Sequence, residues 1–208
     1  MVSCRVLLLL LLPTTVAMAE GASGYLQLSG GVAYPDYKNV SGEEYSFSVR
    51  GGGGLRVPLN PAVDGLFGVF YGAEKLAATV QGQDAYGDEA SQSLELIPRS
   101  IQLDGSAMWA ATEAIGLQAG LNLTLPFGGT WIQSSQSRYG NEATSGDLDK
   151  LLNVDPSTFA SLLVGVHYTI SRGNSVGLNW TYPLGSWTDK FGLEVDYQRL
   201  WVTATFGT

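Results

Sequence analysis

Few residues of this chain could do chemistry, and only one of them is a histidine. His167 is the single histidine and Cys4 the single cysteine among 208 residues. A hydrolase or acyltransferase that uses a nucleophile needs a histidine within reach of a serine and a carboxylate. His167 lies in an alternating apolar segment, between Val166 and Tyr168. We therefore interpret it as a structural residue and expect no catalytic residue, no cofactor and no metal ligand.

A larger set of titratable side chains falls on the polar side of alternating segments. Its members are Arg50, Arg56, Asp64, Asp104, His167, Glu194, Asp196 and Arg199. Charges that are enclosed away from water need partners of opposite sign or hydrogen bonds. We expect these residues to form a network of ion pairs and hydrogen bonds in an enclosed interior.

The composition limits the classes of protein that this chain can represent. Hydrophobic residues make up 45% of it and charged residues only 14%, against roughly 25% charged residues in a typical globular domain. The net charge of -8 disfavours a nucleic-acid partner, because nucleic-acid binding relies on basic surfaces. Only four lysines occur, so a surface solvated by charged side chains is not available.

The first nineteen residues have the layout of a secretory signal peptide. Arg5 precedes an apolar run, 6–12, and the small-residue sequence Ala17-Met18-Ala19 follows it. The run is too short to cross the ~30 Å hydrocarbon layer of a membrane as a helix. We predict a cleaved signal peptide over residues 1–19 and one mature domain over residues 20–208.

Alternation with a period of two dominates the rest of the chain. In its clearest stretch, 115–127, leucines and other apolar residues occupy one face and Gly, Gln, Asn and Thr the other. This pattern predicts strands between two different environments. Eight such segments are expected, at 26–34, 45–57, 63–71, 100–109, 115–127, 161–170, 176–184 and 191–206. The last one changes phase near Gln198 and Arg199, which predicts a β-bulge.

The connections between these segments alternate in length. Tight turns are expected at 58–61, 110–114 and 171–174, and longer polar loops at 35–44, 76–92, 128–157 and 185–190. Turns at one rim and loops at the other are typical of an up-and-down barrel with an even number of strands. The predicted fold class is all-β, an eight-stranded antiparallel up-and-down transmembrane β-barrel.

Two observations place the apolar face of this barrel towards lipid. The other face carries small polar residues, which suit a narrow lumen better than a water-exposed exterior; a soluble, lipocalin-like barrel is the alternative. Aromatic residues also occur near the ends of the apolar faces, as in the aromatic girdles of membrane barrels. The expected interface aromatics are Tyr34, Tyr45, Tyr71, Trp109, Phe127, Tyr168, Tyr182, Phe191 and Phe206.

With this pattern, the stretch from Gly24 to Phe206 resembles the small outer-membrane β-barrels of Gram-negative bacteria, in the OmpA/OmpX-like and opacity-like group. The sequence Leu200-Trp201-Val202-Thr203-Ala204-Thr205-Phe206 looks like the C-terminal signal that the barrel-assembly machinery recognises. Gly207 and Thr208 follow it here, whereas the family pattern ends on the aromatic residue. The resemblance implies an outer-membrane location, periplasmic termini, extracellular loops and contact with lipopolysaccharide.

The expected function is a structural or surface-interaction role, with a lumen filled by side chains and acidic loops facing a possible extracellular ligand. A lumen of eight strands is only wide enough for side chains, so a large pore is excluded. A narrow channel for small hydrophilic or amphiphilic solutes is one alternative. Because some barrels of this family modify lipids, an enzyme that uses His167 is the other.

Overall fold

The computed structural model describes residues 21–37, 46–83, 89–137, 140–147, 158–185, 187–188 and 194–207. The predicted signal peptide, residues 1–19, lies outside this part of the chain. The strands are β1 (Ser23–Tyr37), β2 (Ser46–Asn60), β3 (Val63–Glu74), β4 (Leu76–Gln83), β5 (Glu89–Ala110), β6 (Ile115–Ser137), β7 (Gly140–Asp147), β8 (Phe159–Ser171), β9 (Asn174–Pro183), β10 (Trp187–Thr188) and β11 (Glu194–Gly207).

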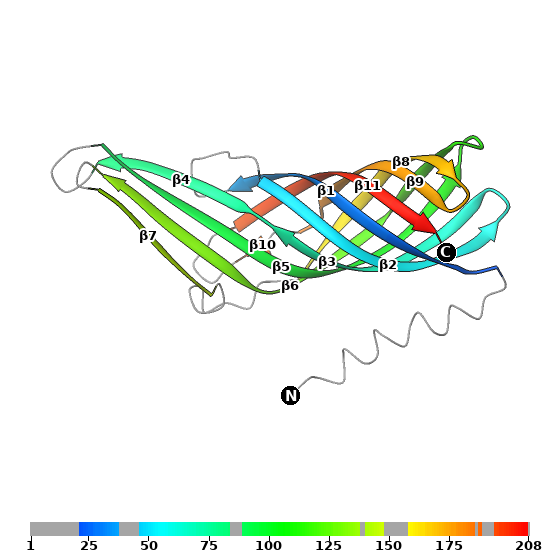
Figure 1. Ribbon diagram of the computed structural model, residues 1–208, viewed down its shortest axis with the longest axis horizontal. Coiled ribbons are helices and arrows are strands. Elements are labelled where there is room, and N and C mark those ends of the chain that lie inside the picture. The colour runs from blue at the N-terminus through cyan, green and yellow to red at the C-terminus, as the bar shows by residue number, and fades with distance from the viewer. Residues whose placement is uncertain are drawn as a thin grey trace, which may run out of the picture.

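A closed antiparallel barrel forms the body of the molecule (Figure 1). Its circuit runs through β1, β2, β3, β5, β6, β8, β9 and β11, and the pairing of β11 with β1 closes it. Closure pairs the strand edges with one another, so the backbone needs no water inside a membrane. The predicted eight-stranded barrel is confirmed.

Short turns join the strands at one rim. Asn60 Oδ1 accepts a hydrogen bond from the Ala62 amide at 2.9 Å, and Thr112 Oγ1 accepts one from the Ile115 amide at 3.0 Å. Side chains of this type replace missing backbone partners in tight turns. The three tight turns therefore lie between β2 and β3, β5 and β6, and β8 and β9, where the sequence predicts them.

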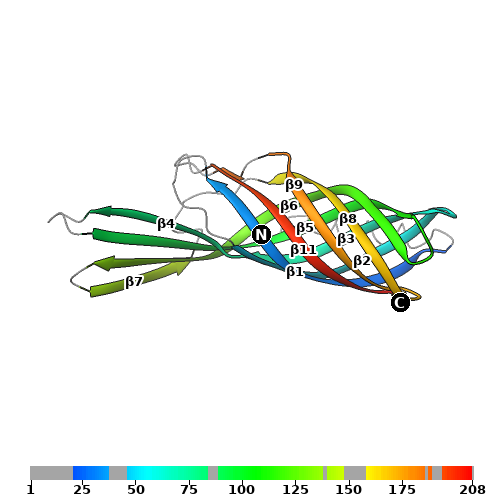
Figure 2. The ribbon, with the colours of Figure 1, turned by 90° about the horizontal axis from the view of Figure 1, so that it is seen from above.

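At the other rim, the expectation of plain loops at 76–92 and 128–157 is wrong in part. β4 and β7 lie in these ranges, and β5 and β6 extend to 22 and 23 residues to pair with them. The four strands form a sheet in the order β4-β5-β6-β7 that projects beyond the barrel (Figures 1 and 2). The sequence analysis missed these strands because β7 has no apolar alternation and the apolar part of β4, residues 76–80, is too short to stand out from a loop.

A β-bulge marks the point where the projecting sheet leaves the barrel. The pairing of β5 with β6 changes register between Pro98 and Ser100. Opposite this step, Gly128 and Gly129 have φ angles of 69° and 151°, which residues with a side chain rarely adopt. The extra residue in β6 bends the sheet away from the barrel wall.

The predicted bulge in the last strand is also wrong. β11 pairs with β1 without a register shift from Val195 to Gly207. The phase change near Gln198 and Arg199 was inferred from the apolar residues Val195 and Tyr197. Because the pairing with β1 keeps its register through these positions, the alternation is unbroken.

The two faces of the barrel differ sharply in polarity. On β6, Leu117, Leu121 and Leu123 are 45%, 52% and 37% exposed on the outside, whereas Gln118 and Asn122 are 8% and 0% exposed inside. An apolar exterior around a polar, enclosed interior is the arrangement of a barrel immersed in lipid. In the described part of the chain, no helix has the length and apolarity that crossing a membrane requires. The apolar outer face makes the barrel strands the membrane-spanning elements.

Candidate functional site

A buried ion pair occupies the middle of the lumen. Arg50 Nη1 on β2 lies 2.8 Å from Asp104 Oδ2 on β5, and the two side chains are 1% and 5% exposed. Arg50 Nη1 also donates to Gln102 Oε1 at 3.3 Å, while Asn122 Nδ2 donates to Asp104 Oδ1 at 2.5 Å. Alternation puts all four residues on the inner face. β5 and β6 are neighbours, whereas Arg50 on β2 reaches across β3 to meet them. Each charge thus has both an opposite charge and an amide as partner.

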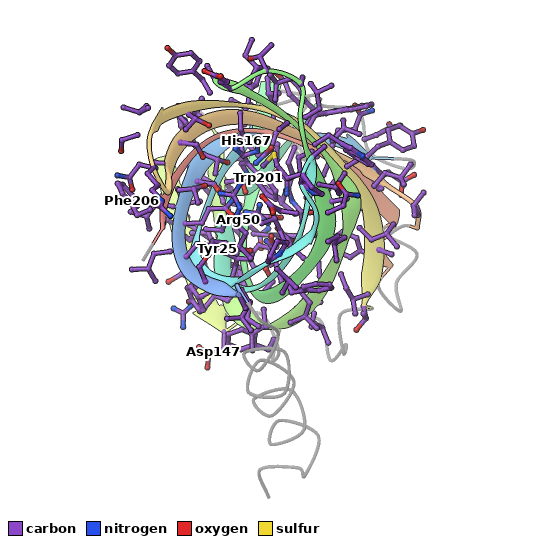
Figure 3. All side chains as sticks on the ribbon, turned by 90° about the vertical axis from the view of Figure 1, so that its right-hand side faces the viewer. Tyr25, Arg50, Asp147, His167, Trp201 and Phe206 are labelled. Carbon is purple, nitrogen blue, oxygen red and sulfur yellow. The ribbon has the colours of Figure 1, made fainter. Side chains whose placement is uncertain are left out.

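Two aromatic rings enclose the guanidinium of Arg50. Its Cζ lies 4.6 Å from the ring centroid of Phe70 and 4.0 Å from that of Trp201. Rings at these distances stabilise a cation through their negative faces. Figure 3 shows Arg50, Trp201, Tyr25 and His167 inside the ring of strands. Aromatic rings and a charge network together fill the cross-section.

A second buried ion pair lies closer to the loop rim. Arg199 Nε on β11 is 2.6 Å from Glu74 Oε1 on β3, with side chains 0% and 3% exposed. The rings of Phe159 and Trp201 lie 5.4 and 5.5 Å from Arg199 Cζ. Glu74 was missing from the predicted set, because we ended the third strand at Tyr71. The spacing of Phe70 and Glu74, both on even positions, was the signal that could have placed it in the lumen.

His167 lies on the turn side of this network. Its Nε2 donates to Gln118 Oε1 at 2.7 Å and to Asn179 Oδ1 at 2.9 Å. The two amides then donate to Ser106 at 2.7 Å and to Thr203 at 3.0 Å. Both oxygens accept, so Nε2 carries the ring proton. The side chains bonded to His167 are therefore amides, not the serine and carboxylate of a nucleophilic site.

The remaining predicted pair lies at the mouth of the barrel beside the turns. Arg56 Nη2 and Asp64 Oδ2 are 2.6 Å apart, and their side chains are 45% and 25% exposed. They line a cavity of about 560 Å³ together with Gln118, His167 and Arg172. Because His167 and Gln118 are buried at its inner wall, this cavity ends at the lumen network.

Of the two acidic residues predicted at the start of the last strand, the structure describes the side chain of one, Asp196. Asp196 pairs with Asp36, and unbroken alternation puts it on the same outer face as Gln198, which accepts a hydrogen bond from the outward-facing Trp180 at 3.2 Å. The lumen assignment of Asp196 is therefore wrong, and the cause is the bulge that we inferred. Glu194 pairs with Thr188 of β10, and its side chain lies outside the described residues.

The aromatic residues assigned to the membrane interfaces lie on the outer face wherever the structure describes them. These are Tyr34, Tyr71, Trp109, Phe127, Tyr168, Tyr182 and Phe206. The Tyr71 and Phe127 rings meet edge to face at 6.0 Å near the loop rim. Tyr45 and Phe191 lie outside the described residues.

The described strands and turns contain no cluster of side chains that could bind a metal ion. No three side chains of His, Cys, Asp or Glu in this part of the chain lie close enough together to hold an ion. The buried carboxylates, Asp104 and Glu74, are each neutralised by an arginine. What the arrangement can do chemically is to hold the barrel wall together from within and to block its lumen.

Comparison with known proteins gives similarity of fold only. No protein-family model and no curated protein matches the chain. Ail of Yersinia pestis, solved in complex with the heparin analogue sucrose octasulfate, is 9% identical with a TM-score of 0.40, covering 90% of this chain and 99% of its own. Neisserial surface protein A is 18% identical with a TM-score of 0.46 and the same coverage.

A third similar structure is the outer-membrane protease OmpT from Escherichia coli. It is 10% identical with a TM-score of 0.43, and the match covers 90% of this chain and 96% of OmpT. Solved structures with a similar fold thus include the outer-membrane proteins Ail and OmpT. By its own closure, apolar exterior and polar interior, the chain is an eight-stranded transmembrane β-barrel with a lumen filled by side chains.

Proposed function

We propose that the protein is an outer-membrane barrel that presents its projecting sheet, β4-β5-β6-β7, at the cell surface for contact with other molecules. The observation that carries this proposal is the contrast between the two halves of the molecule. Ion pairs and rings fill the lumen, whereas β5 and β6 continue far beyond the barrel rim. A protein that served only as a membrane anchor would not need these extensions.

We infer the orientation of the barrel in the membrane from the same contrast. Gly207 bonds to Gly173 at the turn rim, with its amide 2.6 Å from the Gly173 carbonyl oxygen. We place this rim and both termini in the periplasm and the projecting sheet outside the cell, in contact with lipopolysaccharide at its base. Assembly then requires the barrel-insertion machinery, which acts from the periplasmic side.

The experiment that tests the proposal shortens the projecting sheet without touching the barrel. Ala78 pairs with Leu94, and Ile132 with Ser145, so deletion of 78–94 and of 132–145 removes equal lengths from paired strands. Cells that display the intact protein should bind at least one class of molecule on an array of immobilised glycans and extracellular proteins. The shortened protein should lose about tenfold or more of this binding. Equal binding by both proteins would refute the proposal.

An epitope tag tests the orientation separately. A tag inserted between residues 84 and 88 should be labelled on intact cells, whereas a tag between Arg172 and Gly173 should be labelled only after the outer membrane is opened. The reverse result would place the projecting sheet in the periplasm. Heat-modifiable migration on gels controls for folding of both tagged proteins.

Recordings in planar lipid bilayers separate this function from a narrow channel. We expect no steady conductance from the purified barrel, because Arg50, Asp104, Arg199 and Trp201 fill its cross-section. A steady ion current that disappears when the protein is left out would favour the channel and contradict the proposed filled lumen.

Substitution of His167 separates the proposed function from a lipid-modifying enzyme. We expect purified wild-type protein and His167→Ala to show the same background rate with lipopolysaccharide and phospholipid substrates, because the bonded neighbours of His167 are amides. Mass spectrometry of the lipid products measures deacylation and acyl transfer. Turnover by the wild type that is lost in His167→Ala would establish a catalytic role.

A further inference from the structure

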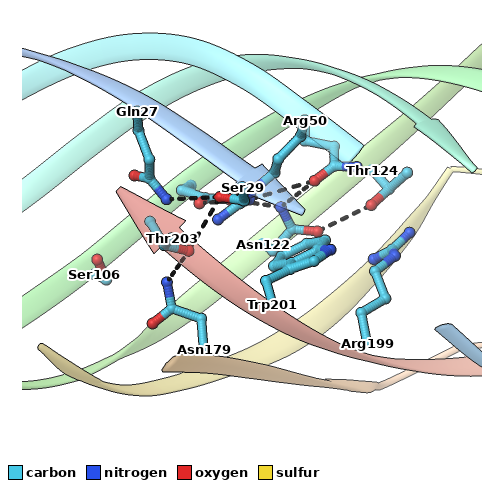
Figure 4. A network of polar contacts seen from close by, with 12 residues as sticks. Gln27, Ser29, Arg50, Ser106, Asn122, Thr124, Asn179, Arg199, Trp201 and Thr203 are labelled. Carbon is cyan, nitrogen blue, oxygen red and sulfur yellow. Dashed lines mark hydrogen bonds and ion pairs between the residues drawn. The ribbon is translucent and has the colours of Figure 1, made fainter. Parts of the chain in front are cut away.

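One contact in the lumen crosses the seam where the first and last strands meet. Trp201 on β11 lies opposite Gly31 on β1, and Gly31 lies opposite Ser48 on β2. The indole of Trp201 nevertheless donates from Nε1 to Ser48 Oγ at 3.0 Å, and both side chains are fully buried. The Trp201 side chain therefore reaches over β1 at Gly31. In Figure 4, Trp201 lies between Arg50 and Arg199.

Only a glycine fits at this position of β1, because the backbone of β11 lies directly beside it. A Cβ at Gly31 would overlap the carbonyl oxygen of Leu200 and lie 2.8 Å from Trp201 Cα. Gly31 is the single glycine among the inward positions 23–35 of β1, because Ser23, Tyr25, Gln27, Ser29, Ala33 and Pro35 have the same phase. Gly31 thus leaves one inward position of β1 without a side chain, here called the notch, and the side chain of Trp201 crosses β1 there to reach Ser48.

The seam, which is the pairing of β1 with β11, is the place in the barrel where the register is least restricted by the chain itself. Every other pair of neighbouring barrel strands is joined by a connection in the chain, which restricts its register. β1 and β11 lie at opposite ends of the chain and have no such link. Alternation excludes a slip by one residue, because that would turn every side chain to the wrong face. A slip by two residues keeps both faces correct, yet it changes the shear of the barrel.

We propose that Trp201 and Gly31 act as a register key, which selects the pairing of the first and last strands when the barrel closes. In the native register, the indole ring of Trp201 crosses β1 at Gly31 and donates a hydrogen bond to Ser48. After a slip by two residues it would meet the side chain of Ala33 or Ser29 instead. The lumen network depends on the same choice, because Trp201 also stacks on Arg50.

Moving the glycine along β1 tests this assignment, because the variant should favour a new register of the β1–β11 pairing. The double variant Gly31→Ala with Ala33→Gly shifts the glycine by two residues. Ala33 lies opposite Ser46, whose buried hydroxyl has no hydrogen-bond partner in the described structure. In the slipped register, Trp201 can therefore fit over the new glycine and bond to Ser46.

Disulfide formation across the seam reports the register. Leu28 lies opposite Ala204 on the outer face, so Leu28→Cys with Ala204→Cys is the native reporter, and Leu28→Cys with Phe206→Cys is the reporter for the slipped register. Opposite residues have Cβ atoms about 4.5–5.5 Å apart and diagonal ones about 7–8 Å, and only the former can be bridged without large movement. Both reporters are built in the full-length protein with Cys4→Ser. Because Cys4 is the single native cysteine, the two introduced cysteines are then the only ones present.

We expect the wild-type seam to form the native disulfide, and the moved notch to raise the ratio of slipped to native disulfide by about tenfold or more. Trp201→Ala, which removes the ring but keeps the notch, should give a mixture of both. Trp180→Phe is the matched control, because Trp180 bonds to Gln198 on the outer face and its substitution should leave the native ratio unchanged.

A native ratio of disulfides in folded Trp201→Ala and in the folded moved-notch variant would overturn the proposal. So would failure of both variants to fold while Trp180→Phe folds, since these residues would then be packing residues only.

Discussion

Replacing Asp104 with alanine is expected to lower the free energy of unfolding of the barrel by about 3–5 kcal/mol, which is the cost of breaking a buried ion pair from one side. The change leaves Arg50 charged in a site where its side chain is 1% exposed. It also removes the acceptor of the Asn122 amide. Equilibrium unfolding by urea in lipid vesicles, followed by tryptophan fluorescence, measures the loss.

Two comparisons show whether burial of the charge is the cause. Asp64→Ala removes the same carboxylate from the Arg56 pair, which is partly exposed, and should cost about 1 kcal/mol or less. The double variant Arg50→Met with Asp104→Leu should recover most of the stability, since apolar residues often replace a buried ion pair without loss. An Asp104→Ala variant as stable as Asp64→Ala would show that the lumen around Arg50 is hydrated.

The second large effect is expected on the outer face. Leu121→Arg should destabilise the barrel in lipid by about 2–4 kcal/mol, the cost of an arginine at the midplane of the bilayer. Leu121 lies halfway along the alternating segment 115–127 and is 52% exposed on the outside. The same measurement of unfolding in vesicles applies.

Position along the strand provides the control for this effect. Ile115, at the turn end of β6, has the same outward orientation, and Ile115→Arg should cost only about 0–1 kcal/mol because arginine can reach the interface there. Equal effects of the two substitutions would contradict the placement of Leu121 in the hydrocarbon layer. A gain in stability from Leu121→Arg would contradict the orientation of the whole barrel.

The barrel itself could be predicted because its physical cause is local. In the stretch from Leu117 to Leu123, each residue meets either lipid or the lumen, and the choice repeats every two residues. The same rule led to the wrong bulge near Gln198, because the apolar residues Val195 and Tyr197 occupy register positions in phase with Arg199 and not with Leu200. Near the rim, apolar residues no longer identify the lipid-facing side, since no lipid chain is there to meet them.

The projecting sheet could not be predicted for a related reason. β7, with the sequence GNEATSGD, carries no apolar alternation, and its pairing with β6 rests on backbone hydrogen bonds that any sequence can make. The candidate site shows the same limit. Arg50 and Asp104 could be placed in the lumen from their phase, but Glu74 could not, because the strand that carries it continues beyond its last outward aromatic residue.

Between the two rims, sequence alone therefore determined which side chains face lipid and which face inwards, because that choice depends on each residue and its immediate neighbours. Tertiary structure decided which inward residues meet: Arg50 with Asp104, Arg199 with Glu74, and Trp201 with Ser48 across Gly31. These partners lie far apart along the chain and are brought together by the register and closure of the strands. Register is a property of the whole barrel, so no local pattern could reveal it.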